Sequence, residues 1–186
     1  MIIVALVILA AGYFVYLALN QPSQPELAAQ NQVLKLWQAQ EIPLVSSDFD
    51  LVDIPDSKFT ALHDSLNSFK SKSTQASDKA LAGIYLVYAD LTLLRKENAA
   101  VTQRMANLPA NQVCSNIPLF QQSADKIKEL AEKAIELTQA LQSFEQAYPA
   151  EFQQTQLTEL TPDLDTLQTQ YRASFENVNE LKRLCG

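Results

Sequence analysis

Two cysteines, Cys114 and Cys185, are the residues whose type and spacing point most directly to chemistry. They lack the Cys-x-x-Cys spacing of thiol-disulfide catalysts, so a redox-catalytic pair is not indicated. They bracket a heptad pattern, and the midpoint between them falls between Pro149 and Ala150. If the chain folds back at that proline, the two thiols meet at the open end, and we predict a structural disulfide. The alternative is two unrelated buried thiols.

Four carboxylates in the segment 43–56 could together hold a calcium ion: Asp48, Asp50, Asp53 and Asp56. An EF-hand loop needs a Gly at its sixth position and a Glu at its twelfth, and the segment has neither. The simpler interpretation is that Asp53 or Asp56 caps the helix that follows, with Pro55 in its first turn. We therefore predict no metal ligands here and keep calcium as the alternative.

His63 is the only histidine, and it lies beside the apolar stripe of a predicted helix. A zinc site of ordinary composition needs further histidines or a cysteine cluster, and a catalytic histidine needs an oriented nucleophile. The sequence also has no P-loop, no Gly-rich dinucleotide turn and no nucleophile motif. We therefore treat His63 as a flank residue and predict a protein that is not an enzyme and that has no cofactor or metal.

Charge and composition limit both the fold and the partners. The formal net charge is -7 and the pI about 4.7, without a basic stripe, which argues against nucleic acid because phosphate binding needs clustered Lys and Arg. Only three glycines occur, and β-branched runs are confined to the N-terminus, so strands have little to form from. The composition favours an all-α protein, and a disulfide suits an oxidising, extracytoplasmic compartment.

An uncharged apolar run, Ile2 to Leu19, begins the chain. About eighteen residues at ~1.5 Å per residue span ~27 Å, just enough to cross a bilayer. A cleaved signal peptide is the alternative, but the basic n-region and the small-x-small cleavage site are lacking. We predict an uncleaved single-pass anchor at 1–20 that contacts membrane lipid through residues 2–19, a hinge at 21–25 and an extracytoplasmic helical bundle at 26–186.

The first predicted helix of the bundle runs from Glu26 to about Glu41 and ends before Pro43, which cannot continue a helix. Trp37, the only tryptophan, is predicted as a core residue, with a place at a partner surface as the alternative. The segment 43–56 is predicted to be an irregular linker. Four apolar residues mark the expected buried side of this helix: Leu27, Leu34, Trp37 and Ile42.

Two further helices are predicted before the first cysteine. One runs from Asp56 to about Ser71, and the polar segment 70–77 after it reads as a loop. The next begins with Ser77 as its cap and extends to about residue 108. Its part 80–94 is apolar nearly all round and should be the most buried helix of the bundle. The expected stripe of the first of these helices is Phe59, Leu62, Leu66 and Phe69.

The region between the cysteines carries two heptad patterns, which predict two long antiparallel helices with a coiled-coil-like seam. Asn116 and Pro118 mark the start of the first helix. Pro162 either begins a fresh helix, leaving 151–160 as a separate short one, or kinks a continuous helix. The seams are Phe120, Ile127, Leu130, Ala134, Leu137, Leu141, Phe144 and Tyr148, then Leu157, Leu160, Leu164, Leu167, Tyr171, Val178, Leu181 and Cys185.

Together these features predict an all-α protein in which a transmembrane helix precedes an antiparallel helical bundle. The rigid faces of such a bundle suit an accessory subunit that binds other membrane or envelope proteins. One alternative is a filament subunit that packs through its apolar N-terminal helix. That order of elements broadly resembles the plan of type IV pilins, but no basic-Gly processing site precedes the apolar run and no Glu sits at its start. A ligand-sensing ectodomain is the other alternative.

Overall fold

The computed structural model of the chain describes residues 24–44 and 47–185. Within these residues the fold is all-α, without a strand. The long helices are α2 (Gln24–Gln38), α3 (Asp56–Lys72), α4 (Ala76–Ala106), α5 (Ile117–Ala147) and α7 (Leu164–Cys185). The short ones are η1 (Asp48–Leu51), η2 (Ala110–Gln112), η3 (Cys114–Asn116), α6 (Pro149–Gln154) and η4 (Gln156–Leu160).

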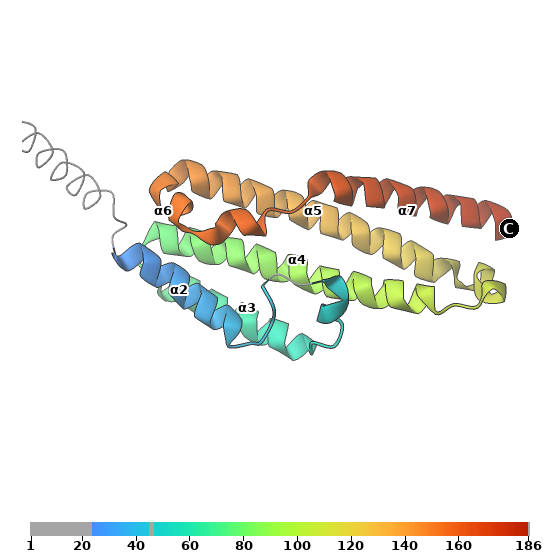
Figure 1. Cartoon of the computed structure of the whole chain (residues 1–186), viewed down its shortest axis with the longest axis horizontal. Coiled ribbons are helices and arrows are strands. Elements are labelled where there is room, and N and C mark those ends of the chain that lie inside the picture. Colours follow the sequence, from blue (N-terminus) through green and yellow to red (C-terminus); the bar gives the residue numbers. More distant parts are fainter. Residues whose placement is uncertain (1–23, 45–46, 186) are drawn as a thin grey trace, which may run out of the picture.

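The helices form an elongated bundle in which α4 and α5 lie side by side along the long axis (Figure 1). α2 and α3 pack against the first half of α4, while α7 packs against the first half of α5, at the opposite end of the molecule. The prediction of an antiparallel helical bundle is confirmed for this part of the chain. None of the helices between residues 24 and 185 is long and apolar enough to span a membrane, and the predicted anchor at 2–19 lies outside the described residues.

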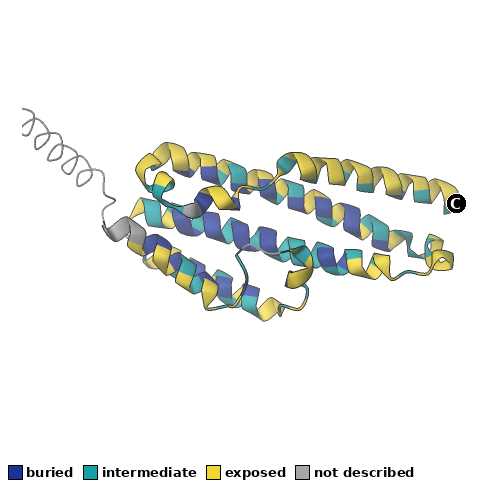
Figure 2. Cartoon of the chain, viewed as in Figure 1, coloured by how far each residue is buried: buried dark blue, intermediate teal, exposed yellow. Residues whose placement is uncertain are grey.

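The core is thickest where α2, α3, α4 and the second half of α5 meet, as the dark segments of Figure 2 show. No residue of α4 between Ala80 and Thr102 is exposed, which confirms that this helix is the most enclosed one. Gly83 lies within this stretch, and a Cβ there would meet only the flexible end of Lys70. The largest fully buried side chains are Trp37, Leu51, Phe59, Leu62, Leu66, Ile84, Tyr85, Leu137 and Leu157.

The first helix of the bundle differs from its prediction at both ends and in its buried face. α2 begins at Gln24 and ends at Gln38, not at Glu41, because the chain reverses through Glu41, whose φ is 55°. Trp37 is buried, as predicted. The remaining buried positions are Ala29, Gln30 and Val33, whereas Leu34 is only half-buried. The prediction for Leu27 falls on a side chain that the structure does not describe.

The connections on either side of α3 differ from their predictions: the one before it is longer, because α2 ends at Gln38, and the one after it is shorter. The linker before it contains η1, whose Leu51 is fully buried, so it is not irregular throughout. The loop after it covers only residues 73–75, because the hydroxyl of Ser73 donates back to the Phe69 carbonyl and extends the helix end. The predicted caps are wrong. Pro55 and Gln75 occupy the N-cap positions, and neither helix has a side-chain cap hydrogen bond.

The heptad predictions for the region between the cysteines hold along α5 from Ile127 on, whereas in α7 only Val178 of the predicted seam is buried and its other positions are half-buried. The seam positions of α5 from Ile127 to Phe144 are buried, and Asn116 with Pro118 starts the helix as predicted. Of the two alternatives for Pro162, the structure has the fresh helix: α7 begins at Leu164, after α6 and η4. Leu157 and Leu160 therefore reach the core from η4 rather than from a continuous second arm.

Candidate functional site

The disulfide end of the bundle lies where η3 leads into α5 and where α7 ends. The sulfur atoms of Cys114 and Cys185 are bonded at 1.97 Å, with their Cα atoms 5.4 Å apart. The separation of the Cα atoms lies within the usual range for disulfides. The predicted meeting of these two cysteines is confirmed, and the bond ties the last residue of α7 to the entry of α5.

Helix α7 is attached to the bundle by a narrow seam. Val178, 2% exposed, is its only buried side chain among the described residues, while Leu164, Leu167, Tyr171 and Leu181 on the same line are half-buried. A hydrogen bond of 3.0 Å from Lys182 Nζ to Gln121 Oε1 adds one polar contact with α5. The disulfide is therefore the strongest restraint on the C-terminal end of this helix.

A groove lies between the second half of α4 and α7, with α5 as its floor. It has a volume of about 390 Å³. Its apolar surface comes from one side chain of α4, one of α5 and two of α7, and small polar groups and one carboxylate line the rest. We call it the α4/α7 groove; it is lined by Met105, Phe120, Ser123, Ser174, Asn177, Val178, Glu180 and Leu181.

Large apolar side chains are also exposed near this groove. On α7, Phe175 is 47% and Leu184 67% exposed, and the Phe175 ring lies 6.3 Å from the ring of Tyr171. Residues nine positions apart project from opposite sides of a helix, so Phe175 and Leu184 do not form one patch; Leu184, three residues after Leu181, is the one on the groove's side of α7. This end of the molecule therefore combines an open apolar groove with a helix that is attached by a narrow seam. The sequence had located the seam of α7 but gave no sign of the groove.

The only histidine takes part in a link between three helices. His63 Nε2 of α3 lies 2.9 Å from Asp90 Oδ1 of α4, and Lys133 Nζ of α5 lies 3.3 Å from Asp90 Oδ2. Lys133 also contacts Glu136 at 2.7 Å, and this hydrogen bond is the main reason that the pKa of Lys133 is raised. His63 thus has a structural partner, and Asp90, at the centre of the link, is a residue that the sequence analysis did not single out for this role.

The acidic linker residues face cationic side chains of α4. Asp48 Oδ1 lies 2.6 Å from Arg95 Nη2, and Asp56 pairs with Lys96. Asp50 accepts a hydrogen bond of 2.7 Å from the Ser47 hydroxyl. Within residues 24–44 and 47–185, no three His, Cys, Asp or Glu side chains gather as metal ligands. The calcium alternative therefore finds no support in the part of the chain that the structure describes.

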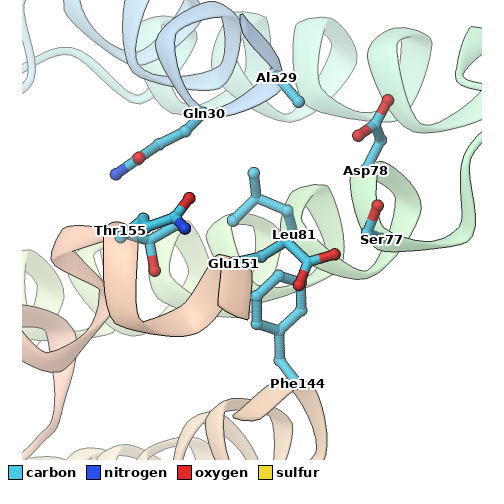
Figure 3. A pocket seen from close by; sticks show the side chains of 9 residues that line it. Ala29, Gln30, Ser77, Asp78, Leu81, Phe144, Glu151 and Thr155 are labelled. Atoms are coloured by element: carbon cyan, nitrogen blue, oxygen red, sulfur yellow. The ribbon is translucent and has the colours of Figure 1, made fainter. Parts of the chain in front are cut away.

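A small polar cavity lies at the other end of the bundle, between α2, the start of α4, the end of α5 and α6 (Figure 3). Its volume of about 20 Å³ suits a single water molecule. The Oε1 atom of Gln154 is buried there without a hydrogen-bond partner in the protein, and such an atom usually meets ordered water. Burial raises the pKa of the Asp78 carboxyl in its wall. The cavity is too small for an organic ligand.

Comparison of the chain with protein-family models, with curated proteins and with solved structures found no match. The end of the bundle opposite the disulfide also has an open groove of about 420 Å³ between α2, the end of α3 and the start of α4, but its lining is mostly polar, so the disulfide end offers the more apolar surface of the two.

Proposed function

We propose that this protein is a membrane-anchored, extracytoplasmic helical bundle that acts as a non-enzymatic accessory subunit by binding another membrane or envelope protein. The α4/α7 groove is the observation that carries the proposal. α4, α5 and α7 leave one side of a four-helix arrangement open there, and Met105, Phe120 and Leu181 offer an apolar surface to a further helix.

The expected occupant is an amphipathic helix of the partner protein, with basic residues beside its apolar stripe. Glu180, which pairs with Arg183 of the same helix at 3.2 Å, is the charged residue that lines the groove, and the chain carries a formal net charge of -7. Electrostatic complementarity of this kind speeds association and selects partners more than it adds affinity. The disulfide supports the same function because it holds the α7 wall in place before a partner arrives, which reduces the ordering cost of binding.

Site-specific photocrosslinking in native cells tests this proposal. A photoreactive amino acid at Met105, which lines the groove, should form a crosslink to one partner protein, whereas the same group at the exposed Ser143 of α5 should not. Leu181→Glu should abolish the Met105 crosslink, because it places a charge on the apolar wall. A matched variant, Gln168→Glu on the exposed side of α7, should keep it.

Three results would reject the proposal. The first is equal crosslinking from both positions, and the second is no effect of Leu181→Glu. The third is the appearance of helical polymers in detergent-purified material, since a filament subunit would assemble with copies of itself. The membrane anchor is tested separately by extraction of the full chain from membranes with alkaline carbonate, which should leave the protein in the pellet. Labelling of an added surface cysteine by an impermeant thiol reagent on intact cells checks the extracytoplasmic side.

A further inference from the structure

A second cleft lies near the middle of the bundle, where η1, α4, α5 and the linker between η4 and α7 converge. Its volume is about 330 Å³. We call it the linker cleft, because residues 161–163 form one of its walls. It shares no lining residue with the α4/α7 groove, so its role is independent of the proposed partner binding. Four leucines supply its apolar surface: Leu91, Leu130, Leu160 and Leu167.

The apolar surface of the linker cleft is well supported by the core. Leu91, Leu130 and Leu160 come from three different elements and are 5%, 3% and 2% exposed. Tyr88 forms another part of the wall, and its hydroxyl donates to the Leu44 carbonyl, which fixes the ring. Because these side chains are held by the packed interior, the cavity has a preformed shape, as small-molecule sites usually do.

The rim of the linker cleft carries more negative than positive charge. The guanidinium of Arg95 lies 2.6 Å from the carboxylate of Asp48, so those two charges balance. Asp163 accepts hydrogen bonds from the backbone N–H of Thr166 at 3.0 Å and from the Thr166 hydroxyl at 2.7 Å. The bond from the backbone N–H is the main reason that the pKa of Asp163 is lowered, and the carboxyl group therefore stays ionised.

Glu159 is the remaining charged group at the rim. It is exposed and forms no ion pair with the residues that the structure describes. A bound anion would therefore face the two carboxylates of Asp163 and Glu159 without a free compensating cation. A cation would be attracted by both, and its binding would not require breaking the pair between Arg95 and Asp48.

We propose that the linker cleft binds a small organic cation, with an amine head at the rim beside Glu159 and an apolar body against the four leucines. The volume lies near the lower end of the range of ligand sites, which limits the ligand to a compact molecule. The apolar contact supplies most of the affinity, and the charge selects the head group.

The protein carries its own reporter for this site. Trp37 is the only tryptophan, and its ring lies 5.3 Å from the ring of Tyr88, which lines the cleft. A ligand against Tyr88 should therefore change the emission of Trp37 when the tryptophan is excited selectively. Calorimetric titration gives the stoichiometry and the affinity independently of that signal.

Three probes with one apolar body separate the contributions of shape and charge: 3-phenylpropylamine, 3-phenylpropanol and 3-phenylpropionate. Each is titrated against the full chain in lipid nanodiscs, with empty nanodiscs to subtract partition into lipid. We expect saturable one-to-one binding of the amine, weaker binding of the alcohol and no saturable binding of the carboxylate. Binding of the carboxylate as tightly as the amine would overturn the proposal, as would absence of saturable amine binding.

Matched variants locate the bound amine. Leu167→Phe should fill the cleft and weaken binding of 3-phenylpropylamine at least about tenfold. Leu184→Phe changes an exposed residue of the same helix that lines neither the cleft nor the α4/α7 groove, and it should leave the affinity unchanged. Glu159→Gln should weaken the amine about threefold, as expected for one exposed charge, and leave the alcohol unchanged.

The exposed Glu176→Gln on α7 is the control for the charge variant and should have no effect. Glu159→Gln changes an exposed side chain, so this variant should fold. It therefore tests the proposal even if Leu167→Phe does not fold. Equal affinities for the amine across Leu167→Phe, Leu184→Phe and Glu159→Gln would show that the probe binds elsewhere and would overturn the assignment.

Discussion

The indole Nε1 of Trp37 donates a hydrogen bond of 2.9 Å to the backbone carbonyl oxygen of Ile42. This contact closes the turn after α2, in which Glu41 has a φ of 55°. The same ring packs against Tyr85 and Tyr88 of α4, with centroid distances of 6.1 and 5.3 Å. One buried side chain thus fills the core and also satisfies a carbonyl of the turn, which explains why the helix ends where it does.

Replacing Trp37 with Phe should lower the free energy of unfolding by roughly 2 to 4 kcal/mol, because it leaves a cavity and an unpaired Ile42 carbonyl. Urea denaturation followed by far-ultraviolet circular dichroism measures the change. Phe49→Leu is the control, since Phe49 is 61% exposed and its loss should matter little. Equal effects of the two substitutions would contradict the core role of Trp37.

The fold could be predicted from the sequence where a periodic pattern of apolar residues leaves only one helix face that can be buried. The seam of α5 and the pairing of Cys114 with Cys185 follow from heptad spacing and from the position of Pro149, and both are present. The buried face of α2 was less determined, because Val33 and Leu34 both lie at helical spacing from Trp37. Packing against α3 and α4 selects Val33, and that choice depends on residues far away in the sequence.

The candidate sites were less predictable than the fold. Asp90 faces His63 and Lys133, which lie 27 and 43 positions away in the sequence, and nothing local to any of the three indicates the others. The α4/α7 groove likewise exists because α7 covers only part of α5. The heptad pattern of α5 shows which face is apolar, but it does not show how much of that face the neighbouring helix covers. Sites formed by the relative placement of distant helices need the assembled structure.

Removing the disulfide should release α7 before the rest of the bundle. In a loop-entropy description, loss of a closure this long destabilises the fold by roughly 4 kcal/mol. We expect the double variant Cys114→Ser with Cys185→Ser to show faster amide hydrogen exchange in α7, whereas the middle of α4 stays protected. The local effect is expected because Val178 is the only buried side chain in the described part of α7.

The reference for that comparison is the oxidised protein under the same conditions. Mass spectrometry without reductant should first confirm that the native material contains the intact bond between Cys114 and Cys185. Uniform acceleration of exchange throughout α4, α5 and α7 would contradict the view that α7 is a separately releasable arm. Two free thiols in native material would remove the argument for an oxidising compartment.

Replacing Asp90 with Ala should destabilise the protein by about 1 kcal/mol, because it removes the contacts with His63 and Lys133 that join α3, α4 and α5. Both contacts are partly exposed, so the difference should shrink as salt is added. Glu132→Ala is the matched comparison, since Glu132 pairs with Lys128 at 3.6 Å within a single helix, a contact worth only about 0.3 kcal/mol. A larger loss for Glu132→Ala would contradict the linking role of Asp90.

Burial raises the pKa of Asp78 in the wall of the small cavity (Figure 3), so its ionised form destabilises the folded state. Above the ordinary pKa of 3.8 the folded protein binds more protons at this site than the unfolded chain, and stability falls as pH rises through that window. Asp78→Asn removes this loss, so the variant should be more stable than the parent at neutral pH, and the advantage should vanish in acid. Thermal unfolding from pH 4 to pH 7 measures it, with the exposed Asp64→Asn as control. A pH-independent difference, or an equal gain from the control, would show that burial of Asp78 is not its cause.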